Sequence, residues 1–215
     1  MTLDISDPFD DLAMPFNWRL ENDGQSAHLT AGDSGGWTSW GVTFATWQAW
    51  QRLHGDPDDT LATFKSLPRT AFLPIFRINY WQAVRADETH PAVSLMVFDA
   101  AVGSGPRIAI ELLQKALGLP ESEIDGLFGN KVTMPAVKAA DPQKLVKAVA
   151  SARIAHYVGT FAHGWDRRTD DCEALALSLF GPPPKLPSVP TAPVVQAQDE
   201  ADALDARFDP ANKSG

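Results

Sequence analysis

One almost wholly apolar run, AVSLMVFDAAVGSG at residues 92–105, constrains the fold of this chain more than any other feature. A helix that is apolar on nearly all sides is stable in water only when other elements cover most of its surface. The remaining apolar residues recur at helical spacing, and no segment shows the clear alternation of a half-buried strand. The sequence therefore predicts a mainly α-helical fold, packed around a central helix that ends between Gly103 and Pro106.

The composition fits one globular domain, or one domain with a tail, because 44% of the 215 residues are apolar. A formal charge of -9 without a basic stripe argues against a nucleic-acid partner. The single cysteine, Cys172, excludes an internal disulfide. These features predict an acidic globular protein whose folding does not depend on an oxidising compartment.

The N-terminus, MTLDISDPFDDLAMPF, is acidic where a secretory signal peptide is basic. No apolar run approaches the ~20 residues of a membrane-spanning helix. The sequence therefore predicts a chain that is made in the cytoplasm without a signal peptide and does not insert into a membrane. A function outside the cytoplasmic membrane then requires another export route.

Changes in composition divide the chain into three predicted parts. Residues 1–8 form a loose acidic lead, and residues 9–180 form the globular part, in which the central helix is followed by further helices. Residues 181–215 switch to a proline-rich and then acidic composition, which is typical of a flexible, disordered tail.

The polar stretch ENDGQSAHLTAGDSGGWTSWGVT, residues 21–43, carries the candidate catalytic groups. Its glycines and its lack of a helical period predict an extended loop or a small hairpin. Cleavage of a glycosidic bond needs two carboxyl groups in different environments. Glu21, at the end of an apolar helix, can have its pKa raised by desolvation, whereas Asp33 in a polar loop stays ionised.

The end of this stretch is suited to bind a sugar and a water molecule. The indoles of Trp37 and Trp40 offer flat apolar faces for sugar rings, and the hydroxyl of Thr38 or Thr43 can hold an attacking water. Thr43 is also a suitable N-cap for the helix that follows. The alternative interpretation is a solvated acidic loop, with the tryptophans folded beneath it as hydrophobic anchors.

Asp99 lies within the apolar run, where an unpaired charge is costly. Two interpretations are open. Asp99 either ties the central helix to a neighbouring arginine or backbone group, or forms part of the wall of a substrate cleft.

Four segments in order resemble the glycoside hydrolase family 108 muramidases, which are phage-endolysin and bacterial peptidoglycan hydrolases. DSGGWTSWGVT at residues 33–43 is similar to the run that follows the family's catalytic Glu, and residues 78–119 look like its central helices. Residues 124–141 are similar to the peptidoglycan-binding-like part associated with the family, and HGWDRR at 163–168 matches its closing helix. The resemblance covers residues 9–180.

The resemblance implies a lysozyme-like catalytic part at residues 9–104, with its active site on a small loop or hairpin. It implies a peptidoglycan-binding-like helical part at residues 105–180 that packs on the first. The implied reaction is hydrolysis of the β-1,4 bond between N-acetylmuramic acid and N-acetylglucosamine in the glycan strands of peptidoglycan. No metal and no cofactor are implied.

The resemblance also assigns roles to residues of the 21–43 stretch. Glu21 is the general acid, with Asp23 as the alternative acid, and Asp33 and Thr38 act with it. Whether the configuration is inverted or retained depends on the separation of the carboxyl groups. The expected substrate-binding residues are Trp37, Trp40, Thr43 and Asp99.

Two departures from the family pattern leave other functions open. ENDGQSAH stands where the family has Glu-Gly-Gly-Tyr, and Gly103 stands where the family more usually has Asn. A chain that has lost catalysis would be a non-catalytic peptidoglycan-binding module. A third hypothesis is a cell-wall effector that uses its tail for docking and has a delivery or immunity protein as partner.

The biological setting of a bacteriolytic enzyme also stays open. A phage lysin, a bacterial self-lysin and a delivered effector share the same chemistry. Each would act on the cell wall, in the periplasm or outside the cell, after holin-type release or delivery.

Overall fold

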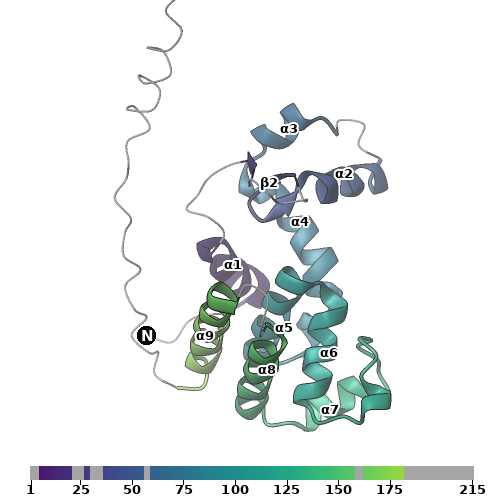
Figure 1. Cartoon of the computed structure of the whole chain (residues 1–215), viewed down its shortest axis with the longest axis vertical. Coiled ribbons are helices and arrows are strands. Elements are labelled where there is room, and N and C mark those ends of the chain that lie inside the picture. The colour runs from purple at the N-terminus through teal and green to yellow at the C-terminus, as the bar shows by residue number, and fades with distance from the viewer. Residues whose placement is uncertain (1–4, 21–26, 30–35, 56–58, 158–161, 182–215) are drawn as a thin grey trace, which may run out of the picture. The chain divides into compact units, whose positions relative to one another are not determined.

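The computed structural model describes residues 5–20, 27–29, 36–55, 59–157 and 162–181. It is mainly helical, as predicted, with one small antiparallel sheet. The helices and strands of Figure 1 are α1 (Met14–Leu20), β1 (His28–Leu29), β2 (Trp37–Ser39), β3 (Val42–Thr43), α2 (Phe44–Leu53), α3 (Leu61–Ser66), α4 (Leu73–Phe76), α5 (Pro91–Ser104), α6 (Pro106–Ala116), α7 (Thr133–Ala139), α8 (Pro142–Tyr157) and α9 (Ala162–Ser178).

Short helical segments of other types connect these elements. They are the π-helical η1 (Phe9–Ala13) and η4 (Arg77–Gln82) and the 3₁₀-helical η3 (Arg69–Phe72), η5 (Ala86–Glu88) and η6 (Glu121–Glu123). None of the helices in the described parts of the chain has the length and apolar character needed to cross a membrane. The tail from residue 182 onward lies outside the described residues, so its disorder stays a prediction.

Helix α5 is the central element of the fold, which confirms the prediction from its apolar run (Figure 1). The side chains from Ala92 to Ala101 are all buried, and α5 contacts η1, η4, η5, α6, α8 and α9. Its N-cap is His90, whose Nδ1 accepts a hydrogen bond from the backbone N–H of Ala92 at 3.2 Å. The helix ends at Gly105, where a φ of +86° favours glycine.

Three aromatic rings fix η1 and η4 on the central helix. Phe9, Trp81 and Phe98 pack edge to face, with centroid distances of 5.5 to 5.9 Å. The indole Nε1 of Trp81 donates a hydrogen bond to Asp87 Oδ1 at 2.6 Å, so its polar atom is satisfied. Such pairs contribute about 0.5–1.5 kcal/mol each beyond their buried area. This packing holds the segment that leads directly into α1.

The sheet is a small hairpin structure with strand order β1-β2-β3. Thr38 of β2 lies opposite His28 on one side and Thr43 on the other. The strands have two or three residues each, which agrees with the loop or small hairpin expected from the sequence. Thr43 also caps α2, because its Oγ1 accepts a hydrogen bond from the backbone N–H of Thr46 at 3.2 Å, as predicted.

A second aromatic group holds α2, α3 and η3 together beside the sheet. Phe44 and Trp47 of α2 stack at 5.9 Å and both contact Phe64 of α3, at 5.3 and 5.5 Å. Phe64 in turn meets Phe72 of η3 at 5.7 Å. The helices that follow the hairpin therefore have an apolar anchor of their own.

The turn between α6 and α7 is organised by one buried amide, Gln114. Its Nε2 donates to Asp125 Oδ1 at 2.8 Å and to Thr133 Oγ1 at 3.1 Å, and its Oε1 accepts from the backbone N–H of Gly126 at 3.0 Å. Gly126 has a φ of +71°, and a Cβ there would lie 2.5 Å from Arg107 Cγ. The Asp-Gly sequence of this turn therefore has a structural explanation.

Candidate active site

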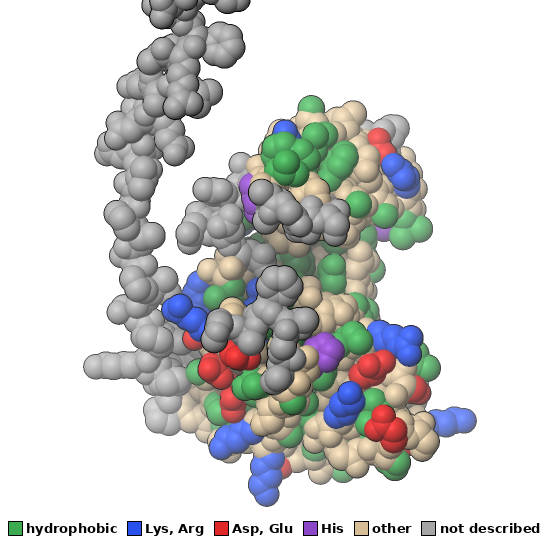
Figure 2. Space-filling model, viewed as in Figure 1, with side chains coloured by type: hydrophobic (Ala, Val, Ile, Leu, Met, Phe, Trp, Pro, Cys, Tyr) green, Lys and Arg blue, Asp and Glu red, His purple; other side chains and the backbone are tan. Residues whose placement is uncertain are grey.

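The candidate site lies where α1 meets the part of the fold that carries the hairpin. In Figure 1, β2, α2 and α3 lie at one end of the helical body, and α5, α6, α8 and α9 at the other. Figure 2 shows the surface hollowed between these two groups. Helix α1 ends at Leu20, and in its last turns the Trp18 ring packs against the Arg69 guanidinium of η3, 4.7 Å from the ring centre.

Three of the predicted catalytic positions cannot be described. Glu21, Asp23 and Asp33 lie outside the described residues, so their roles stay predictions. The described elements beside them in sequence are α1 and β2: Glu21 is the first residue after α1, and Asp33 precedes β2 by four positions.

The two predicted threonines have different surroundings. Thr38 and Thr43 are both half-buried and face each other as partners of β2 and β3. The Thr43 hydroxyl is engaged by the backbone N–H of Thr46 and lies 2.9 Å from the Thr46 hydroxyl. The Thr38 hydroxyl makes no hydrogen bond to another residue of the described chain. Thr38 is therefore the better candidate to hold a water molecule, and Thr43 has a clear structural task.

The predicted sugar-binding tryptophans both lie on the hairpin and are half-buried. The ammonium of Lys65, from α3, lies 3.3 Å from the ring centre of Trp37, so a cation occupies one face of this indole. Trp40 forms the two-residue turn between β2 and β3 with Gly41, and their φ values are +51° and +83°. Positive φ at both positions is typical of a type I′ turn, but it is strained for a bulky residue such as Trp.

The strained turn fixes the position of the Trp40 side chain. Its Nε1 is buried and has no hydrogen-bond partner among the described residues, and the same holds for Trp18 Nε1. Strained backbone and unused buried donors are found more often at functional sites than elsewhere. Both observations support a functional role for this end of the hairpin.

Asp99 occupies the interior and pairs with two arginines. Its side chain is 1% exposed, and Arg153 Nη2 lies 2.6 Å from Oδ2. Arg168 donates to Oδ1 from Nε at 2.9 Å, and its Nη2 lies 2.7 Å from the same oxygen in an ion pair. Burial disfavours the charged form of Arg153, but Asp99 outweighs this and holds the pKa of Arg153 above its ordinary value. This geometry favours the structural interpretation of Asp99 over contact with a substrate, since both carboxylate oxygens are occupied.

Gly103 makes room for an aromatic side chain from α9. A Cβ at Gly103 would lie 2.4 Å from Cζ3 of Trp165, so the indole fills the space beside this glycine. Trp165 stacks on Tyr157, with a centroid distance of 5.1 Å, and the Tyr157 hydroxyl lies 2.7 Å from Ser104 Oγ. The space beside Gly103 is therefore filled by the stacked pair of Trp165 and Tyr157.

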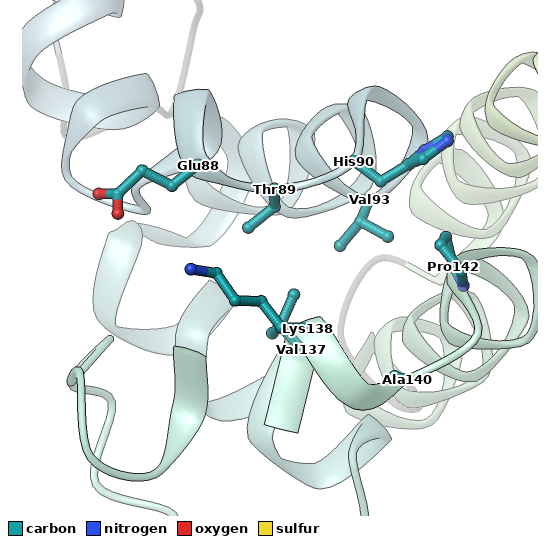
Figure 3. Close-up of a pocket in the computed structure, with 8 residues that line it drawn as sticks. All are labelled: Glu88, Thr89, His90, Val93, Val137, Lys138, Ala140 and Pro142. Carbon is teal, nitrogen blue, oxygen red and sulfur yellow. The ribbon is translucent and has the colours of Figure 1, made fainter. Parts of the chain in front are cut away.

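A separate pocket of about 170 Å³ lies between η5 and the start of α5 on one side and α7 on the other (Figure 3). Val93 and Val137 form its apolar wall, and Glu88 and Lys138 extend at the same end of it. The charge of Lys138 contributes, after the hydrogen bond from Arg85, to lowering the pKa of Glu88.

The described residues offer no cluster of three His, Cys, Asp or Glu side chains that could hold a metal ion. Sequence reasoning did not identify Lys65 or Arg69 as neighbours of the site. These contacts join residues far apart in sequence, and no local pattern signals them.

Comparisons with known proteins place this arrangement in a class. Residues 16–105 match the family described as Glycosyl hydrolase 108, and residues 108–169 match the family described as Predicted Peptidoglycan domain. The structure of Brucella abortus SagA is similar, with 32% identity and a TM-score of 0.65, and the match covers 78% of this chain and 92% of that chain. No curated protein matches the chain.

The fold and these matches define a mainly helical glycoside hydrolase with a peptidoglycan-binding part. The chain belongs to the glycosyl hydrolase 108 family. This confirms the family resemblance read from the ordered motifs. The family assignment does not identify the catalytic residues.

Proposed function

We propose that this protein is an N-acetylmuramidase that hydrolyses the β-1,4 bond between N-acetylmuramic acid and N-acetylglucosamine in peptidoglycan. The observation that carries the proposal is membership of the glycosyl hydrolase 108 family, joined in one chain to a peptidoglycan-binding segment. The end of α1 at Leu20, directly before Glu21, supports Glu21 as the general acid.

In the proposed reaction, Glu21 donates a proton to the glycosidic oxygen as the bond from C1 of N-acetylmuramic acid to that oxygen breaks. Water supplies the hydroxyl of the new reducing end. Asp33 stabilises the positive charge that develops on the sugar ring or activates the water, and the Thr38 hydroxyl orients that water. Trp37 and Trp40 bind the flanking sugar rings.

Peptidoglycan lies outside the cytoplasmic membrane, so we propose that the protein acts in the periplasm or outside the cell. Holin-type release or delivery by another protein would bring it there. The proposed partner is the glycan strand itself, and the Predicted Peptidoglycan domain match at residues 108–169 supports binding to it.

The test is mass spectrometry of the soluble products released from purified peptidoglycan by the wild-type protein, Glu21→Gln and Asp23→Asn. We expect products that end in a reducing N-acetylmuramic acid from the wild type and from Asp23→Asn, and none from Glu21→Gln. An active Glu21→Gln protein beside an inactive Asp23→Asn protein would transfer the role of acid to Asp23. Both variants must show wild-type circular dichroism for the comparison to hold.

A second candidate function is a peptidoglycan-binding module without catalysis. It is favoured by the run ENDGQSAH and by the replacement of an amide with the Gly103 and Trp165 pair. This function predicts that the wild-type protein sediments with purified sacculi and releases no reducing ends. Release of reducing ends by the wild type, lost in Glu21→Gln, would exclude it.

A further inference from the structure

The pocket between η5, the start of α5 and α7 has apolar walls and charged groups at one end. The buried side chains of Val93 and Val137 face each other across it, and Pro142 lines it at the other end (Figure 3). Its volume of about 170 Å³ is below the ~300–1,000 Å³ that is usual for a site enclosing a whole small molecule. A cavity of this size suits one side chain or end group of a longer ligand.

The charged end of this pocket has a positive charge in excess. Arg85 donates to Oε1 of Glu88 from Nε at 2.7 Å and to Oε2 from Nη2, so these two side chains neutralise each other. The exposed ammonium of Lys138 acts on Glu88 electrostatically, but it forms no ion pair or hydrogen bond with the described residues. The donors of Lys138 are therefore available to a ligand.

A second pocket adjoins the first at the junction of α7 and α8. It has a volume of about 330 Å³ and lies between the end of α6, α7 and α8. Ala140 lines both pockets, which makes them neighbours. Most of the second lining is alanine, and Lys144 stands at this pocket as Lys138 stands at the first, exposed and without an ion pair in the described chain. A ligand that crosses Ala140 therefore meets two small apolar hollows, each with a lysine.

This part of the chain is basic although the whole chain is acidic. In a chain with a formal charge of -9, residues 131–147 contain four lysines and one carboxylate, that of Asp141. Oδ1 of Asp141 is engaged, because it accepts a hydrogen bond from the backbone N–H of Lys144 at 2.9 Å. A local excess of positive charge attracts anionic ligands and sets their orientation. The two pockets thus complement a ligand that has carboxylates and small apolar groups.

The linings favour the peptide part of peptidoglycan over its sugars. Among the described residues that line the two pockets, His90 has the one ring, and that ring stacks on Phe180 at a centroid distance of 4.8 Å. Sugar rings therefore find no open aromatic platform here. The peptide stems of peptidoglycan are short and rich in alanine, and they carry free carboxylates that an ammonium group binds well. Lys138 and Lys144 both lie in the segment that matches the Predicted Peptidoglycan domain.

We propose that the two pockets form a binding site for the peptide stems of peptidoglycan, in which Lys138 and Lys144 bind carboxylates and the apolar hollows hold small side chains. The inference rests on the proposed function, because it takes peptidoglycan as the ligand. In Figure 1, α7 lies at the end of the helical body away from β2, so this site holds a part of the wall away from the proposed site of cleavage. Two separate contacts with one polymer raise the effective concentration of each.

The test is an NMR titration of the full-length protein with the synthetic stem peptide L-Ala-γ-D-Glu-meso-diaminopimelic acid-D-Ala. The control ligands are the same peptide with its carboxylates amidated, and the disaccharide N-acetylglucosaminyl-N-acetylmuramic acid without a peptide. Lys138→Gln and Lys144→Gln each remove one charge, and Ala140→Leu fills the border of the two pockets without changing the charge.

Lys147→Gln is the matched control variant. It removes the same charge from α8, but Lys147 lines neither pocket, and its charge acts on Glu173 of α9. A general attraction of anions to this basic stretch would depend on Lys147 as much as on Lys144. A built site depends on Lys144 alone of these two.

We expect the wild type to bind the peptide with a Kd below about 1 mM. Lys138→Gln and Lys144→Gln should each raise the Kd about threefold, as expected for one exposed charge pair, and the double variant about tenfold. Ala140→Leu should raise it at least about fivefold, because overfilling a close contact is unfavourable. Lys147→Gln should stay within about 1.5-fold of the wild type at physiological salt. The amidated peptide and the disaccharide should bind at least about tenfold more weakly than the peptide.

A wild-type Kd in the folded double variant Lys138→Gln/Lys144→Gln would overturn the proposal. Equal binding of the amidated peptide or of the disaccharide would also overturn it, and so would a loss in Lys147→Gln as large as that in Lys144→Gln. If Ala140→Leu fails to fold by circular dichroism, the two exposed lysines decide. Release of reducing ends by a wild type that does not bind the peptide overturns the inference alone. Peptide binding by a wild type that releases no reducing ends overturns the proposed hydrolysis and supports the inference.

Discussion

The buried carboxylate of Asp99 should dominate the stability of the helical body, and Asp99→Asn tests this directly. The substitution keeps the shape of the side chain but leaves Arg153, with a fully buried side chain, and Arg168, with an 11% exposed one, without their shared anion. Breaking a buried ion pair costs about 3–5 kcal/mol. Total stabilities of domains are about 5–15 kcal/mol, so we expect a loss of roughly 4 kcal/mol of unfolding free energy, a large part of the whole.

Urea unfolding followed by tryptophan fluorescence measures the effect. With a slope of about 2 kcal/mol per molar urea, the midpoint should fall by about 2 M. Asp170→Asn, which removes the same charge from an exposed position on α9, should change the free energy by less than about 0.5 kcal/mol. Adding Arg153→Met to Asp99→Asn should recover part of the loss, since the double variant buries one cation fewer. A loss below about 1 kcal/mol in Asp99→Asn would refute this reasoning.

Three further predictions follow from single side chains. Gly103→Ala should cost about 1–3 kcal/mol and alter the near-UV circular dichroism, because its Cβ displaces Trp165; an unchanged spectrum would contradict the close approach. Burial lowers the pKa of His90, so the unfolded chain binds this proton more readily, and unfolding free energy should fall as pH drops below about 6.5. His90→Asn, a neutral cap, should reduce that fall, and an identical pH dependence would argue against it. Burial raises the pKa of the Cys172 thiol, so thiol reagents should modify the native protein at least about 100-fold more slowly than the unfolded chain.

The parts of the fold that sequence could predict are those set by local chemistry. The apolar run of α5 predicts a helix covered on nearly all sides, because its few polar residues form no continuous face toward water. The sequence predicts Thr43 as a helix cap, and its Oγ1 accepts a hydrogen bond from a backbone N–H in the first turn that follows. Short-range signals of this kind do not depend on the rest of the chain.

The contacts that organise the candidate site arise from residues distant in sequence. Arg153 and Arg168 lie 54 and 69 positions after Asp99, and only the folded chain brings them together. An Asp in an apolar helix predicts that a charged or hydrogen-bonding partner exists, because an unpaired buried charge is costly. The sequence does not identify which residue that partner is. In the same way, nothing near Trp37 in sequence predicts that Lys65 covers one face of its ring.

The hairpin shows the limit of pattern reading for short strands. Strands of two or three residues are too short to show an alternation of buried and exposed side chains. Only the glycines and the threonine cap therefore predict the hairpin. The strained turn at Trp40 runs against the preference of its residue type. Local rules fail most often where function imposes the conformation.

The ion pairs of Asp99 bear on how such chains can be recombined in evolution. The two family matches abut between residues 105 and 108, which suggests two cassettes that could be exchanged between relatives. Yet the carboxylate lies before this junction and both of its arginines lie after it. A crossover at the junction would transplant the anion without its cations unless the incoming segment carries the same two arginines. The two matched segments therefore form one structural unit from α1 to α9. Relatives that exchange one segment must keep Asp99, Arg153 and Arg168 together.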